Sequence, residues 1–293
     1  MIGPSSVVNL PVATPAATMS IDVEDWFQVE NLKSAIRRDS WDSQVLRVEQ
    51  NTDRMLELLD THDAKSTFFV LGWVAERCPH LVRRIAEAGH EVASHGYGHE
   101  LIYDLTPAAF REDVLRANGL LEEITGAKVR GYRAPSFSIT DWAVDILLDV
   151  GVEYDSSAFR TIAHDRYGRL SGMSAGQPVI KLRSGFTEVC VSSLNVGSYP
   201  LPWGGGGYFR MIPYPVFSRG VRQILRSGTP YVFYIHPWEI DAGQPRVAAS
   251  RLKRSHRLRH YVNIDRCQAR WTRLLADFAW ITIADLLSRG VAA

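Results

Sequence analysis

Short apolar runs alternate with longer stretches of mixed polarity through the first half of the chain. The runs are bounded by turn-forming residues and predict strands at 18–22, 67–71, 90–94, 129–132 and 152–155. The intervening stretches predict helices that begin at Asn51-Thr52, Pro79, Thr106-Pro107 and Asp141. This alternation predicts a parallel sheet with right-handed crossovers, and the pattern alone fits an open sheet and a closed barrel equally well.

The second half of the chain has a less regular pattern. Its elements are predicted as strands at 179–182, 187–191, 230–235 and 280–283, with helices at 215–227 and from 267 onward. Four consecutive glycines at 204–207 predict a flexible loop, which is either a plain turn or a segment that contacts a ligand.

The length of 293 residues is sufficient for one large α/β domain, and no linker divides the sequence. We therefore expect a flexible leader over 1–17 and a single domain over 18–293, with an elaboration from about 160 to the end. No apolar run is long enough for a membrane span, and the first residues lack the pattern of a signal peptide, so a cytoplasmic location is expected.

The balance of charges excludes some partners. The net charge is +1, which gives no global field for binding nucleic acid or an acidic membrane.

Three widely spaced cysteines suggest neither a disulfide framework nor a zinc ribbon. The run 251–260 holds five Lys/Arg and no acid, so it is either a solvated face, which is favoured, or a contact for a phosphate-bearing substrate or an anionic surface.

Residues of the types that act in catalysis and metal binding follow the predicted strands. The four groups at strand ends are Asp22/Glu24/Asp25, His95/His99, Arg133 and His236. Because the carboxyl ends of parallel strands lie on one side of a sheet, we expect these groups to form one site. Two imidazoles four residues apart in a glycine-containing loop, together with a carboxylate, are suitable ligands for a divalent cation.

In order and spacing, these residues resemble the motifs of the NodB-homology polysaccharide deacetylases. Ser20–Asp25 stands in the place of the first motif, His95–His99 matches the histidine spacing of the second, and Arg133-Ala134-Pro135 is the third. Trp203 is the candidate for the fourth motif, and Tyr234–His236 corresponds to the fifth. The Asp-Val-Glu-Asp-Trp-Phe variant resembles the branch associated with exosortase and exopolysaccharide loci.

The resemblance implies a distorted, incomplete (β/α) barrel and metal-dependent removal of N-acetyl groups from an amino-sugar polysaccharide or oligosaccharide, in exopolysaccharide biosynthesis. It implies Asp22 as the general base, Arg133 as the partner that orients it, and His236 as the general acid. The implied metal ligands are His95, His99 and a carboxylate, with Zn²⁺ as the default ion.

The first motif departs from the family at Val23, which stands where the family has its metal carboxylate and cannot bind a metal. Glu24 shares a strand face with Asp22 and is favoured as the ligand, whereas turn geometry could select Asp25 instead. The candidate substrate-binding residues are Trp26, Pro135, Trp203 and Trp238. For the tryptophans, packing in the core is an equally good interpretation.

Two other functions are compatible with the sequence. One is hydrolysis of an amide or formamide on a small molecule by the same barrel. The other is carbohydrate binding by a pseudoenzyme that has lost its base or metal. Retention of Asp22, the two histidines at 95 and 99, Arg133 and His236 argues against the pseudoenzyme, because an inactive site has no physical need for all five.

Overall fold

The computed structural model describes residues 8–9, 16–159, 167–168, 170–171, 178–183 and 186–290. Most of the predicted leader, residues 1–17, therefore lies outside the described residues. No helix in the described ranges is long and apolar enough to cross a membrane.

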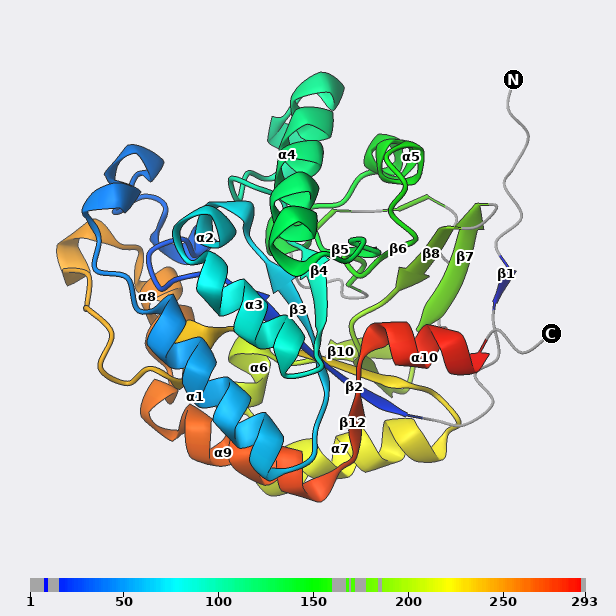
Figure 1. Ribbon diagram of the computed structural model, residues 1–293. Coiled ribbons are helices and arrows are strands. Elements are labelled where there is room, and N and C mark those ends of the chain that lie inside the picture. Colours follow the sequence, from blue (N-terminus) through cyan, green and yellow to red (C-terminus); the bar gives the residue numbers. More distant parts are fainter. Residues whose placement is uncertain are drawn as a thin grey trace.

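One curled sheet forms the centre of the molecule (Figure 1). Its strands, in spatial order, are β1 (Val8–Asn9), β7 (Val179–Arg183), β8 (Phe186–Val189), β6 (Tyr154–Asp155), β5 (Gly131–Tyr132), β4 (Glu91–Ser94), β3 (Ser66–Val70), β2 (Ala17–Val23) and β11 (Tyr231–Ile235). The short strand β12 (Trp280–Ile281) also pairs with β2. From β8 to β11 every pairing is parallel, whereas β7 runs antiparallel to its two neighbours.

The residues after β8 bring the two sides of the curled sheet together. The backbone N–H of Ser192 donates to the carbonyl of Val232 over 3.2 Å, and the Ser192 hydroxyl accepts from the Val232 N–H over 2.8 Å. The chain then forms a hairpin of β9 (Ser193–Val196) and β10 (Tyr199–Pro202). The distorted, incomplete (β/α) barrel implied by the resemblance is confirmed.

Helices surround the sheet (Figure 1). They are α1 (Val48–Thr61), α2 (Gly72–Arg77), α3 (Pro79–Glu87), α4 (Pro107–Thr125), α5 (Asp141–Asp149), α6 (Gly206–Met211), α7 (Tyr214–Arg226), α8 (Arg254–Tyr261), α9 (Ile264–Asp277) and α10 (Ile283–Gly290). Among the short 3₁₀ turns, η1 (Glu30–Leu32), η4 (Pro135–Phe137) and η5 (Pro237–Ile240) lie near the candidate site. The core consists largely of apolar side chains from the strands and the inner faces of the helices, because burial of that surface is the main driving force for folding.

Two predicted boundaries are wrong for long-range reasons. Helix α1 begins at Val48, before the predicted cap at Asn51-Thr52, because the carboxylate of Asp25 accepts hydrogen bonds from the N–H groups of Arg47 and Val48. The predicted glycine loop is partly helical, since α6 begins at Gly206. At Gly205 the backbone passes so close to β11 that a Cβ atom would lie 2.0 Å from the Tyr234 carbonyl oxygen.

Candidate active site

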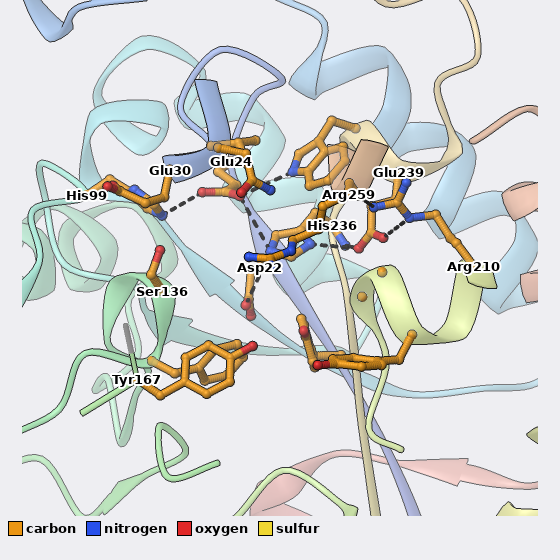
Figure 2. A pocket seen from close by; sticks show the side chains of 18 of the residues that line it. Asp22, Glu24, Glu30, His99, Ser136, Tyr167, Arg210, His236, Glu239 and Arg259 are labelled. Atoms are coloured by element: carbon orange, nitrogen blue, oxygen red, sulfur yellow. Dashed lines mark hydrogen bonds and ion pairs between the residues drawn. The ribbon is translucent and has the colours of Figure 1, made fainter. Parts of the chain in front are cut away.

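Three of the four predicted groups line one pocket at the carboxyl ends of the central strands, through Asp22, Glu24, His95, His99 and His236 (Figure 2). The fourth, Arg133, contacts Asp22 without lining the pocket. Asp22 lies near the end of β2, His95 directly follows β4, Arg133 follows β5 and His236 follows β11. The parallel register places these strand ends on the same side of the sheet. His99, at the end of the glycine-containing loop after β4, turns back toward the pocket with φ of +57°.

Glu24, His95 and His99 form a compact cluster of potential metal ligands. One ligand atom from each residue lies within 4.8 Å of the other two. Oε2 of Glu24 is 2.7 Å from Nε2 of His99, yet this buried oxygen has no hydrogen bond of acceptable geometry. Nδ1–H of His95 donates to the carbonyl of Arg133 over 2.8 Å, which leaves the Nε2 lone pair available for a cation.

Burial and neighbouring charges set the protonation states of this cluster. Burial lowers the pKa of His95 to about 4, so the imidazole is neutral near pH 7. Burial alone would raise the pKa of Glu24, but the nearby imidazoles, with His99 the largest contributor, lower it to about 2. A neutral imidazole and an ionised carboxylate are the forms in which these groups bind metals.

Asp25 does not join the cluster, although the sequence left it open as the metal carboxylate. Its carboxylate accepts hydrogen bonds from three backbone N–H groups, those of Trp26, Arg47 and Val48, at 2.7–2.9 Å. The side chain therefore joins the β2–η1 turn to the start of α1. The carboxylate that the structure brings to the two histidines is that of Glu24.

Asp22 and Arg133 form an ion pair at the bottom of the pocket. Nη1 of Arg133 lies 2.7 Å from Oδ1 of Asp22 and also donates to the Ser20 hydroxyl over 2.7 Å. The remaining guanidinium N–H groups donate to the carbonyl and hydroxyl oxygens of Ser156, both at 2.8 Å. Both charged side chains are almost completely buried, so these contacts fix the orientation of the Asp22 carboxylate.

His236 is held by a buried carboxylate that the sequence analysis missed. Nδ1–H of His236 donates to Oε1 of Glu239 over 2.8 Å, and Oε2 of Glu239 accepts from Nε of Arg210 over 2.7 Å. Nε2 of His236 faces the pocket, 3.4 Å from Glu24 and 3.8 Å from Asp22. Burial alone would lower the pKa of His236, but the hydrogen bond to Glu239 and the surrounding carboxylates raise it to about 9.

The predicted substrate-binding residues lie in different environments. Trp238 lines the pocket, where its indole N–H donates to Oε1 of Glu24 over 3.2 Å. Trp26 and Trp203 are buried in the core outside the pocket, with their indole N–H groups bonded to backbone carbonyls. Pro135 begins η4 and is itself buried, whereas the next two residues of that turn line the pocket.

Several lining residues were not individually proposed from the sequence as site residues. Tyr208 and Met211 come from α6, Arg259 comes from α8, and Tyr234 comes from β11. For Glu239 a local signal did exist, because its spacing of three from His236 across Pro237 fits a short capped turn. The sequence leaves the glycine run 204–207 and the basic run 251–260 each open as a ligand contact, and both contribute residues to the pocket wall, but it does not predict that they meet at one wall.

Two family models together match most of the chain. Residues 39–154 match the model described as polysaccharide deacetylase, and residues 156–288 match a domain of unknown function, DUF3473. The first match contains His95, His99 and Arg133, and the second contains His236. Asp22 and Glu24 precede both matches.

Curated relatives match a part of the chain. A peptidoglycan-N-acetylglucosamine deacetylase of Bacillus cereus is 29% identical over 120 residues, which cover 36% of this chain and 44% of the relative. A chitooligosaccharide deacetylase of Sinorhizobium fredii is 38% identical over 100 residues, covering 33% of this chain and 44% of that protein. The chain thus spans less than half the length of these relatives.

Solved structures match nearly the whole chain. A putative polysaccharide deacetylase from Mycobacterium smegmatis superposes with a TM-score of 0.63 at 21% identity, covering 99% of this chain and 95% of the other. A CE4 family pseudoenzyme from Bacillus anthracis has a TM-score of 0.51 at 17% identity, with coverages of 94% and 66%. At these identities the comparison shows a shared fold.

Proposed function

The chain belongs to the polysaccharide deacetylase family, and from this premise we propose that it hydrolyses N-acetyl groups on an amino-sugar polysaccharide or oligosaccharide. The observation that carries the proposal is the convergence of three units on one pocket: the Glu24–His95–His99 cluster, the Asp22–Arg133 pair and His236 with its buried carboxylate. The likeness of the first motif to the exopolysaccharide-locus branch favours an exopolysaccharide as the polymer.

The proposed cofactor is a divalent cation held by Glu24, His95 and His99. The fit rests on the unbonded, buried Oε2 of Glu24 and on the His95 tautomer, which leaves Nε2 free. Two nitrogens and one oxygen suit Zn²⁺, and this set leaves positions open for water and substrate. When bound, such an ion would polarise the acetamide carbonyl and increase the acidity of a nearby water.

The protein's own groups supply the proton transfers in this proposal. Asp22, held by Arg133, accepts a proton from the attacking water. His236 enters the reaction as imidazolium and donates its Nε2 proton to the leaving amine nitrogen as the C–N bond breaks, releasing acetate. Glu239 orients this imidazole and stabilises its charged form.

The decisive experiment measures metal content and acetate release on the same purified samples. Wild type should hold about one divalent ion per chain and release acetate from N-acetylglucosamine oligomers. Asp22→Asn should retain the metal and lose turnover by about 100- to 10,000-fold, the usual contribution of a general base. His95→Ala should lose both, and His62→Ala, at the end of α1 outside the pocket, should lose neither.

Two results would contradict the proposal. Wild type that binds metal but releases no acetate from any oligomer would exclude this substrate class and leave the small-amide or binding functions. Wild type that binds no divalent ion would show that the histidine pair is structural.

A further inference from the structure

The pocket has a second charged region, beyond the groups used in the proposed reaction, on the wall formed by α6 and α8. Figure 2 shows Arg259 on the side of the pocket where Glu239 lies, with His99 on the opposite side. The two arginines on this side, Arg210 and Arg259, have different environments. That difference indicates which of them is available to a ligand.

Arg210 is largely occupied by the protein. Its guanidinium pairs with Glu239 and donates to the backbone carbonyls of Arg259, His260 and Val262 at 2.7–3.0 Å. The side chain is 1% exposed. Arg210 therefore connects the last turn of α8 to the carboxylate that holds His236, and four of its five N–H donors are used in these contacts.

Arg259 has no such partner. Its side chain is half-buried and lines the pocket, and in the part of the chain that the structure describes its guanidinium makes no ion pair or hydrogen bond. Its backbone carbonyl, by contrast, is fixed by Arg210. An arginine partly removed from water without an acceptor is unfavourable, and an anion in the pocket would relieve that cost.

The carboxylates that line the pocket are already committed and do not neutralise Arg259. Asp22 pairs with Arg133, Glu30 with Lys33 and Glu239 with Arg210, and Glu24 belongs to the proposed metal cluster. The charges around Arg259 also favour an anion, because residues 251–259 hold five Lys/Arg and no Asp or Glu in a chain whose net charge is only +1. Helix α8 packs on η1 at the pocket, so the positive charge of this run lies beside the pocket.

We propose that Arg259 binds an anionic group carried by the glycan next to the N-acetylated sugar, so that the preferred substrate is an acidic amino-sugar polymer. This inference rests on the proposed function for the identity of the reacting group. A guanidinium fits a uronate carboxylate and a sugar phosphate equally well, because both accept two parallel N–H donors. The exposed cations of the same run would attract such a chain toward the pocket.

Three probes separate these possibilities: tetra-N-acetylchitotetraose, a tetrasaccharide of alternating N-acetylglucosamine and glucuronate, and diacetylchitobiose 1-phosphate. Calorimetric Kd and steady-state kcat/KM for acetate release are measured on wild type, Arg259→Gln and Arg257→Gln. Arg257 is an exposed residue of the same helix that does not line the pocket, so it is the matched control for loss of one positive charge.

Wild type should prefer at least one acidic probe over the neutral one by about 10- to 100-fold, the range for a charge-assisted hydrogen bond. Arg259→Gln should abolish that preference, and Arg257→Gln should keep most of it. Preference for the glucuronate probe alone identifies a carboxylate, and preference for the phosphate probe alone identifies a phosphate.

Three outcomes would overturn the inference. The first is equal affinity of wild type for neutral and acidic probes, and the second is an unchanged acid preference in Arg259→Gln. The third is an equal loss of acid preference in Arg257→Gln, which would mean that the positive charge of the run acts without a specific contact. The two proposals fail separately. Binding preference without acetate release from any probe refutes the deacetylase activity alone, whereas acetate release without acid preference refutes the Arg259 site alone.

Discussion

Protonation of His260 should destabilise the fold, because this imidazole is buried directly behind the candidate site. Its ring stacks on Trp238 with centroids 4.4 Å apart, and that indole donates to Glu24. Nε2–H donates to Oε1 of Gln244 over 2.8 Å, while Nδ1 is buried without a hydrogen-bond partner. Burial and then the charge of Arg210 lower the pKa of His260 to about 3, against smaller opposing contributions from nearby carboxylates.

The direction of the pH effect follows from this lowered pKa. In the unfolded chain the imidazole regains its ordinary pKa of 6.5, so between pH 6.5 and about 3 the unfolded state binds more protons than the folded state. Stability is therefore lost as the pH falls through this window. Each pH unit below 6.5 costs about 1.4 kcal/mol, which gives about 2 kcal/mol between pH 8 and pH 5 from this one group.

Urea unfolding of wild type and His260→Gln at pH 8, 7, 6 and 5 tests this reasoning. The variant should be less stable than wild type at pH 8, because it loses the stack on Trp238. The difference between the two proteins should shrink by about 2 kcal/mol at pH 5. His62→Gln, which removes an imidazole outside this stack, is the reference. A difference between wild type and His260→Gln that stays constant across the four pH values would refute the reasoning.

Three further substitutions distinguish the roles of the site residues. Glu239→Gln should lower kcat by about 10- to 100-fold, because His236 loses its carboxylate, and should also lower the thermal midpoint, because the buried Arg210 guanidinium is left without its counter-ion; steady-state kinetics and a melting curve measure both. Arg133→Met should lower the free energy of unfolding by about 3–5 kcal/mol in urea titrations, because Asp22 remains buried without its partner. Asp25→Ala should lower the free energy of unfolding by about 1–2 kcal/mol through loss of the α1 cap, yet keep the bound metal. Glu24→Ala should lose the metal. Elemental analysis that found the metal lost from Asp25→Ala and kept in Glu24→Ala would contradict this assignment.

Features with local causes could be predicted from the sequence. Helix α4 begins at Pro107, as predicted, because Thr106 caps its N-terminus through Ala109. It ends at Thr125, where Gly126 takes a left-handed conformation. The convergence of the strand-end residues was also predictable, since it requires only that consecutive strands be parallel. The pairing of Asp22 with Arg133 was an expectation from the family resemblance, and the structure contains that ion pair.

Features with distant causes could not be predicted. The start of α1 depends on Asp25, which is 23 residues before Val48 in the chain, so the local sequence points to a later cap. The choice between Glu24 and Asp25 depends on the same long-range contact, because the hydrogen bonds to α1 draw Asp25 away from the histidines. For the basic run 251–260 the sequence left a solvated face and an anionic contact open, and the residue of this run that lines the pocket depends on how α8 packs.

The two halves of the chain contribute different parts of the chemistry. The first half supplies the Glu24–His95–His99 cluster and the Asp22–Arg133 pair, at the carboxyl ends of strands of the central sheet and in the loops that follow them. The second half, matched by the domain of unknown function, supplies His236 and the wall that contains Arg259.

Arg210 connects His236 to the wall that contains Arg259. Its guanidinium donates both to Glu239, the carboxylate that holds His236, and to the backbone carbonyls at the end of α8. A shift of α8 when a glycan binds Arg259 would therefore be transmitted to the proton donor through a single, fully buried side chain. This connection gives the second half a physical reason to contain both the proposed acid and the proposed substrate-binding wall.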